Sequence, residues 1–265
     1  MKALITGASS GLGLEMAKYL AKKKYELILV ARNKERLQEI QNSLPTKTMI
    51  VAMDLREEQK IKELYVIAQS EDIDILINNA GFGKCALFKD IELKEELDMI
   101  NTNIKAVHML TKLFLKEMVK KDRGYILNVS SSAAFLPGGP LMSTYYATKS
   151  YIRSLTEGIW YELKKMDSKV SISCLLPGPT DTNFNKVANV MFSVKPMDKK
   201  IVAKYAIDEM FKKKLLIIPG YKMHLAKFSQ RFCSDKMLLK IIYKIQKKKI
   251  TKKKEKDTTI SQNNL

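Results

Sequence analysis

The stretch TGASSGLG, residues 6–13, joins a short apolar run, KALIT (2–6), to a segment whose apolar residues recur at helical spacing. Its three glycines, Gly7, Gly11 and Gly13, allow the backbone to turn sharply and to approach a phosphate group closely. A helix that begins here offers unpaired N–H groups and the positive end of its dipole to an anion. A tight turn without a ligand would also use glycine, but the position directly after the first strand favours a dinucleotide-binding turn.

The rest of the chain repeats the order of an apolar run followed by a helical segment. We expect strands at 2–6, 25–32, 47–55, 73–81, 124–131, 169–179 and 214–220. Most of these runs are continuously apolar, which is typical of parallel strands covered by helices on both faces. Right-handed crossovers then predict a Rossmann-like α/β fold, a doubly wound parallel sheet of about seven strands that binds ligands at the carboxyl ends of its strands.

The composition argues against several classes of protein. The chain has three widely separated cysteines and two histidines outside any ligand-like cluster, so we expect neither a metal site nor a disulfide framework. The N-terminal apolar run passes directly into the glycine turn, which does not fit a secretory signal peptide. Apolar runs are too short for a membrane span. We therefore expect a cytoplasmic protein.

The net charge of +19 is concentrated at the C-terminal end. From residue 199 onward the chain holds nineteen Lys or Arg residues against five acidic ones. We expect one domain over residues 1–222, a basic amphipathic helical extension over 223–250 and a disordered tail over 251–265. The extension could lie at an anionic membrane surface, close an apolar substrate mouth, contact a second subunit or be a solvated helix. Charge alone could also attract nucleic acid, but no specific nucleic-acid contact is expected.

The end of the second expected strand reads VARNKER, residues 30–36. Folds that bind NAD usually place an acidic residue here for the ribose 2′-hydroxyl. This chain has Ala31 followed by Arg32, and an arginine can pair with a 2′-phosphate that a carboxylate would repel. The pattern favours NADP over NAD, with the alternative that Arg32 only begins a solvated helix.

Six motifs together resemble the short-chain dehydrogenase/reductase (SDR) family. They are TGASSGLG, NNAG (78–81), Asn103 in NTNIKAV (101–107), NVSS (128–131), YYATK (145–149) and PGPTDT (177–182), and they match in order and spacing over residues 2–222. The resemblance implies an NADP(H)-dependent oxidoreductase that transfers hydride between nicotinamide and a carbonyl/alcohol substrate, and a homo-oligomer. The alternatives are a catalytically silent nucleotide-binding regulator and a membrane-associated scaffold with the same fold.

In the family, the tyrosine of the YxxxK motif is the acid/base, which here selects Tyr145 together with Lys149. The two residues are one helical turn apart and share a face of the helix. We expect the ammonium to lower the pKa of the phenol, whose ordinary value is near 10. Tyr146 points about 100° away around the helix and is expected to pack.

The resemblance adds Asn103, which would hold a water of the proton relay, and a serine that would hydrogen-bond the substrate oxygen. Counting from Gly124 selects Ser131 as this serine, whereas counting back from Tyr145 selects Ser132. We choose Ser131 and leave Ser132 as the alternative.

The resemblance further implies an extended cofactor site. Within it, Asp54 would bond the adenine amino group, and the loop at Thr180 and Thr182 would hold the nicotinamide carboxamide. The family's substrate lid corresponds to residues 183–197. Its apolar residues indicate either an apolar substrate, a ketone or a 3-oxoacyl-like compound, or packing in the core: Phe184, Val187, Val190, Met191 and Phe192. The complete set of expected cofactor residues is Thr6, Gly7, Ser9, Ser10, Gly11, Leu12, Gly13, Arg32, Asp54, Leu55, Asn79, Ala80, Gly81, Tyr145, Lys149, Pro177, Gly178, Thr180 and Thr182.

Overall fold

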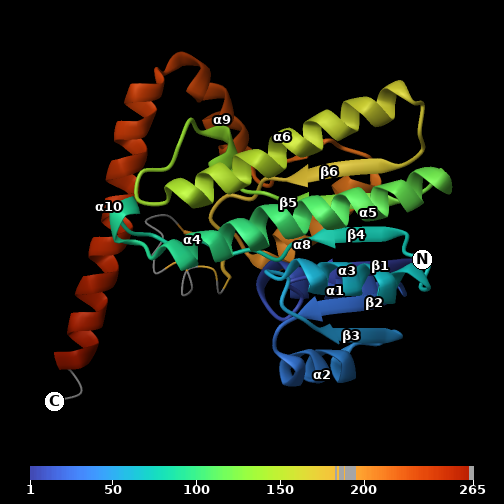
Figure 1. Cartoon of the computed structure of the whole chain (residues 1–265). Helices are drawn as coiled ribbons and strands as arrows, with labels where there is room; N and C mark the ends of the chain where they lie inside the picture. The colour runs from blue at the N-terminus through green and yellow to red at the C-terminus, as the bar shows by residue number, and fades with distance from the viewer. Residues whose placement is uncertain (183, 185–187, 189–194, 263–265) are drawn as a thin grey trace.

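A computed structural model of the chain describes residues 1–182, 184, 188 and 195–262. Its centre is a seven-stranded sheet in the order β3-β2-β1-β4-β5-β6-β7, with every neighbouring pair parallel (Figure 1). The predicted doubly wound α/β fold is therefore confirmed. The strands are β1 (Lys2–Thr6), β2 (Glu26–Ala31), β3 (Thr48–Ala52), β4 (Ile75–Asn78), β5 (Tyr125–Val129), β6 (Ser171–Leu175) and β7 (Leu216–Ile217).

Helices cover both faces of the sheet, and each layer has its own apolar core. On one face pack α1 (Gly11–Lys22), α2 (Lys34–Ser43) and α8 (Lys199–Phe211). On the other face pack α3 (Glu58–Gln69), α5 (Val107–Lys120) and α6 (Ser143–Lys165). The central strands are buried on both sides, which explains why their sequences are continuously apolar.

The helical stretch expected before β5 contains an irregular turn. It consists of α4 (Leu93–Ile100), a π-helical turn (Asn101–Ala106) and α5, which follow one another without a break. A π turn is rare and is frequently found at functional sites. Here it carries Asn103, whose side chain is completely buried.

The carboxyl ends of the strands share one edge of the sheet, and the C-terminal helix lies beside that edge (Figure 1). Beyond β7 the chain forms α9 (Tyr221–Ser229), a short 3₁₀ turn (Gln230–Phe232) and α10 (Asp235–Gln262). Residues 251–262, expected to be disordered, continue α10 as helix, and residues 263–265 lie outside the described part. Lysine, glutamate and glutamine all have high helix propensity, which favours this continuation. Among the described helices none has an apolar stretch long enough to cross a membrane.

Candidate active site

The glycine turn packs closely against the end of β4. Gly7 has a φ of +64°, in the left-handed region that glycine adopts without strain. A Cβ on Gly13 would lie 2.5 Å from the Gly7 carbonyl oxygen and from the Asn79 amide nitrogen. The Asn79 amide donates to the carbonyl oxygens of Thr6 and Gly7 at 3.0 and 3.1 Å. The Thr6 hydroxyl accepts from the backbone N–H groups of Asn79 and Ala80, both at 3.0 Å. These bonds fix the turn in the shape of a backbone cradle.

The first turn of α1 faces this cradle. The first backbone bond of the helix is donated by Leu14 to the carbonyl of Ser10, so the N–H groups of residues 11–13 precede the helical ladder. Within the described part of the chain, the Ser10 side chain makes no capping hydrogen bond to them. Thr182 lies against the same turn, because a Cβ on Gly11 would be 3.3 Å from the Thr182 Cβ. The arrangement fits an anion at a helix N-terminus.

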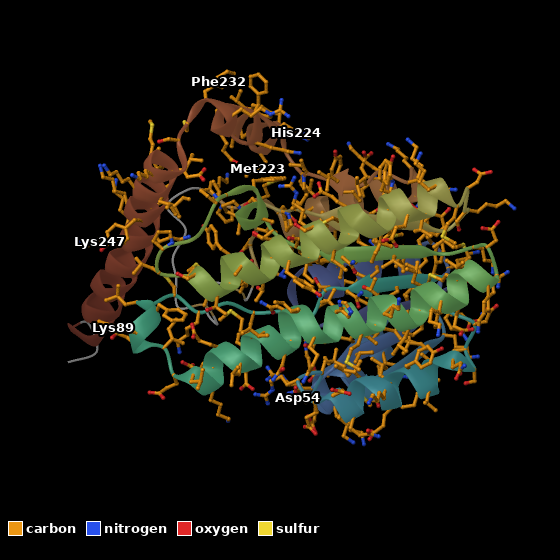
Figure 2. All side chains as sticks on the ribbon, turned by 45° about the horizontal axis from the view of Figure 1, so that its top comes forward. Asp54, Lys89, Met223, His224, Phe232 and Lys247 are labelled. Carbon is orange, nitrogen blue, oxygen red and sulfur yellow. The ribbon has the colours of Figure 1, made fainter. Side chains whose placement is uncertain are left out.

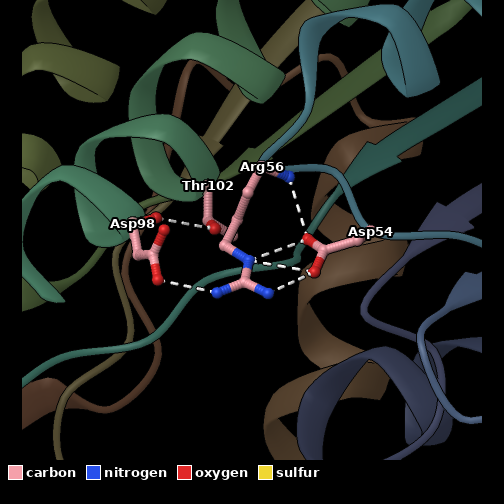
Figure 3. A network of polar contacts seen from close by, with 4 residues as sticks. All are labelled: Asp54, Arg56, Asp98 and Thr102. Atoms are coloured by element: carbon pink, nitrogen blue, oxygen red, sulfur yellow. Dashed lines mark hydrogen bonds and ion pairs between the residues drawn. The ribbon is translucent and has the colours of Figure 1, made fainter. Parts of the chain in front are cut away.

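An ion-pair network joins the segment after β3 to α4 (Figure 3). The Asp54 carboxylate accepts bonds from the Arg56 backbone N–H, Nε and Nη2, and Arg56 Nη1 donates to Asp98 at 2.7 Å. The Arg56 hydrogen bonds hold the pKa of Asp54 below its ordinary value, and exposed Arg32 lies close enough to lower it further. Both Asp54 oxygens therefore already accept two bonds each, and the expected contact of Asp54 with the adenine stays a prediction.

The π turn places Asn103 beside the end of β4. Its amide donates to the carbonyl of Phe82 at 2.9 Å and to the Thr148 hydroxyl at 3.1 Å, and its oxygen accepts from the Phe82 N–H at 3.0 Å. A Cβ on Gly81 would lie 2.9 Å from Asn103 Oδ1 and 3.3 Å from Lys149 Nζ. The chain at Gly81 thus runs directly past both polar side chains. These bonds brace this backbone against α6 and leave the Asn103 oxygen one further acceptor site.

Tyr145 and Lys149 lie at the start of α6, where it meets the end of β5. Both residues are buried, and Lys149 Nζ donates to the Val129 carbonyl at 3.0 Å and lies 5.9 Å from the centre of the Tyr145 ring. The Ser131 side chain lies close enough to the Tyr145 phenol to lower its pKa. The structure therefore brings Ser131, Tyr145 and Lys149 together at one edge of the sheet.

The pKa of Tyr145 differs from the expectation. Burial raises the pKa of the phenol to about 12, and the hydrogen bond with Ser131 offsets this only in part. Burial also lowers the pKa of Lys149 to about 8. The shift of the Tyr145 pKa comes from burial, the Ser131 side chain and Tyr146, and the Lys149 ammonium does not contribute the expected lowering. At neutral pH Tyr145 is a protonated phenol.

The three serines at the end of β5 have different surroundings. The Ser130 hydroxyl donates to the Lys149 carbonyl at 2.7 Å and so ties β5 to α6. The Ser132 backbone N–H donates to the Pro177 carbonyl, and a 3₁₀ turn (Ser132–Phe135) begins there. The Ser131 side chain lies beside Tyr145. The choice of Ser131 over Ser132 as the catalytic serine stays a prediction.

The loop after β6 borders the site from the other side. Thr180 is buried, its hydroxyl donates to the Gly178 carbonyl at 2.9 Å, and its backbone pairs with Met197. The Thr182 hydroxyl accepts from the Phe184 N–H at 3.3 Å. This loop therefore lies between the glycine turn, which Thr182 contacts, and the Tyr145 ring, which Phe184 contacts.

An apolar cluster surrounds Tyr145. Phe184 packs with its ring centre 5.2 Å from that of Tyr145. Of the other lid residues expected to contact a substrate, Val187, Val190, Met191 and Phe192 lie outside the described residues. The cluster consists of Phe82, Cys85, Met99, Ala133, Leu136, Leu141, Met142, Tyr145, Tyr146, Phe184, Ala188, Leu238 and Ile242.

Sequence reasoning missed Arg56 and Gln246. Arg56 follows Asp54 by two residues, and that spacing signals a local turn bond. Gln246 bonds the Tyr146 hydroxyl at 2.8 Å across one hundred residues, which no local pattern signals. Within the described residues, no three His, Cys, Asp or Glu side chains gather in a way that could hold a metal ion.

Comparison with known proteins agrees with this geometry. Residues 1–191 match the family model described as short chain dehydrogenase. An uncharacterized oxidoreductase of Staphylococcus epidermidis is 32% identical over 182 residues, which are 68% of this chain and 78% of that relative. The chain belongs to the short-chain dehydrogenase family, and it is an oxidoreductase of that family.

Solved structures show the same fold. A short-chain dehydrogenase of Sphingobium yanoikuyae in complex with NADPH is 25% identical, with a TM-score of 0.78 over 87% of this chain and 94% of that chain. The bulky-bulky ketone specific alcohol dehydrogenase of Comamonas testosteroni is 26% identical, with a TM-score of 0.73 over 87% and 92% of the two chains. A Burkholderia phymatum SDR in complex with NAD, 20% identical with a TM-score of 0.79 over 87% and 92%, shares the fold alone. Nicotinamide cofactors of both kinds thus bind this fold.

Proposed function

We propose that the protein is an NADPH-dependent reductase of bulky, apolar ketones. The observation that carries the proposal is the buried Tyr145 side chain, which lies beside Ser131 and Lys149 and is surrounded by apolar side chains. A protonated phenol is the state that a general acid needs in order to give a proton to a carbonyl oxygen. The ketone specificity of the Comamonas relative supports the substrate class. Ketone-dependent loss of the near-ultraviolet absorbance of NADPH tests the proposal.

The residues fit a nicotinamide dinucleotide. Gly7 and Gly13 let the turn pack directly against the end of β4, where a Cβ would clash with Ala80, Asn79 or the Gly7 carbonyl, and the first N–H groups of α1 lie in the same turn. Arg32 is exposed directly after β2, where it can pair with a 2′-phosphate. The acidic residue that would favour NAD at this position is replaced by Ala31 and Arg32.

Because Asp54 already bonds Arg56, we assign the adenine contact to the backbone of Asp54 and Leu55. Ser9, Ser10 and Leu12 complete the phosphate turn, and Ala80 and Gly81 border the nicotinamide ribose.

Each proposed catalytic residue has its own role in the reaction. The bound cofactor supplies the hydride. Tyr145 gives its proton to the substrate oxygen, and the Ser131 hydroxyl hydrogen-bonds that oxygen as negative charge develops on it. Lys149 has a pKa of about 8, so it can hold a proton at neutral pH and stabilise the phenolate that remains. Asn103 fixes the backbone at Phe82 and Gly81 and holds the relay water. Pro177, Gly178, Thr180 and Thr182 fix the carboxamide.

We also propose a peripheral contact with an anionic membrane through the outer surface of α9 and α10. Phe228 and Phe232 are 56% and 76% exposed, and Figure 2 shows Phe232 at the outer corner of the C-terminal segment. Exposed Lys236, Lys240 and Lys244 lie on the adjoining helix. Apolar side chains flanked by lysines are the pattern of an interfacial helix.

The variant Lys240→Glu/Lys244→Glu tests this contact. Each lysine near an anionic surface contributes about 1 kcal/mol, so binding to phosphatidylserine vesicles should fall about tenfold or more in co-sedimentation. Lys22→Glu/Lys23→Glu, at the end of α1, makes the same change in charge and should not alter binding. Equal sedimentation of the wild type with phosphatidylcholine vesicles, or none with either lipid, would exclude the contact.

We also propose that the protein forms a homo-oligomer. Leu93, Leu97 and Ile100 are exposed along α4, and Tyr151 is exposed on the neighbouring helix α6. An apolar surface of this kind supports association with a second copy of the chain.

A further inference from the structure

Helix α10 forms part of the apolar cluster around Tyr145. Ile242 is 4% exposed and packs into the cluster, and Leu238, one turn earlier, packs against it. Both residues lie beyond the stretch 1–191 that matches the family model. This wall of the cluster is therefore contributed by the chain's own C-terminal segment.

Gln246, one further turn along the same face, brings a buried polar group to this wall. It is 2% exposed, and its amide nitrogen donates to the Tyr146 hydroxyl at 2.8 Å. Its Oε1 is buried and has no hydrogen-bond partner among the described residues. Turning the amide over would let Oε1 accept from the tyrosine, but the NH₂ group would then lose its partner. In either orientation one polar group of Gln246 remains unsatisfied.

An unsatisfied buried amide group costs about 1–3 kcal/mol, so folded proteins seldom keep one without a reason. Here the group stands next to the proposed catalytic centre. The Tyr146 ring, which holds Gln246, lies perpendicular to the Tyr145 ring with 6.2 Å between their centres. A Cβ on Gly139 would clash with the Tyr146 ring at 2.1 Å, so this ring is packed directly against the loop before α6. Gln246 is thus held in place beside the cluster.

We infer that Gln246 is a substrate-recognition residue that binds a hydroxyl group on the far side of an apolar ketone from its carbonyl. A hydroxyl can donate to Oε1 or accept from the NH₂ group, so it satisfies Gln246 in both orientations. A fixed polar group among apolar side chains selects strongly for the matching substrate group, because an analogue without it leaves the protein group unpaired. The inference rests on the proposed ketone reductase function and names its substrate class.

The test compares cyclohexyl-cyclohexanones with their hydroxycyclohexyl counterparts, over the available ring positions of the hydroxyl. For at least one pair the wild type should prefer the hydroxylated ketone by about tenfold or more in kcat/KM, the effect of one well-placed hydrogen bond. The nearly isosteric variant Gln246→Met should lose this preference while it still reduces the ketone without the hydroxyl. That retained turnover also shows that the variant is folded.

Two outcomes would overturn the inference. One is a wild type that shows no hydroxyl preference with any pair, a result that needs no variant. The other is a Gln246→Met protein in which both members of a pair lose turnover equally, as a merely structural role predicts. Calorimetry, which measures the binding of both ketones of each pair to the protein–NADP complex, separates a failure of the Gln246 inference from a failure of the proposed function. A hydroxyl preference in binding without any turnover would keep the recognition site and reject the reductase.

Discussion

Replacing Tyr145 with phenylalanine is expected to lower kcat for ketone reduction by about 10²- to 10⁴-fold, the usual contribution of a positioned general acid. The change removes one hydroxyl and leaves the ring, which packs against Phe184 and Tyr146. The apolar cluster should therefore stay intact. The affinity for NADPH, measured by calorimetry, should change by no more than a few-fold. The lower kcat would then result from the loss of proton transfer and not from weaker cofactor binding.

Tyr161→Phe is the matched control, since it removes the same hydroxyl from an exposed tyrosine on the same helix. It should keep the wild-type kcat. A Tyr145→Phe protein that retains wild-type turnover would show that another group supplies the proton, and the roles given to Ser131 and Lys149 would fail with it.

The variant Arg32→Asp is expected to reverse the preference between the two cofactors. A charge-assisted hydrogen bond contributes about 1.5–3 kcal/mol, so its loss should weaken NADPH binding by about 10- to 100-fold, and repulsion between carboxylate and phosphate adds to this. The new carboxylate can accept the ribose 2′-hydroxyl of NADH, whose affinity should stay equal or rise. Calorimetric titration of wild type and variant with both cofactors measures the change.

Arg36→Asp controls for net charge, because Arg36 is one helical turn further along α2 and pairs with Glu39 at 2.6 Å. It should affect both cofactors equally and weakly. A wild type that binds NADH as tightly as NADPH would contradict the choice of NADP, whatever the variants do.

Much of the fold could be predicted from the sequence because its signals are local. The glycine turn, the apolar runs and their alternation with helices specify parallel strands covered on both faces, and the structure confirms them. The expected site residues also converge, since the carboxyl ends of parallel strands must share an edge. Gly7 packs closely against Ala80, and Gly81 packs closely against Asn103 and Lys149. Ser131 lies beside Tyr145.

What the sequence could not supply depends on contacts between distant residues and on burial. Asp54 has the right position for an adenine contact, but its charge attracts Arg56, which also binds Asp98 forty-two residues away from it. The YxxxK spacing predicts that Tyr145 and Lys149 are neighbours, yet only the depth of burial decides that the phenol pKa rises. The Gln246–Tyr146 contact depends on how α10 folds back onto the body of the protein.

The most direct test of the whole account is the oxidation of NADPH by the wild-type protein in the presence of bulky apolar ketones, followed by the fall in near-ultraviolet absorbance. The account predicts ketone-dependent oxidation with at least one member of the panel and much slower oxidation of NADH. Tight NADPH binding without oxidation by any ketone or aldehyde would contradict it and would indicate a nucleotide-binding regulator.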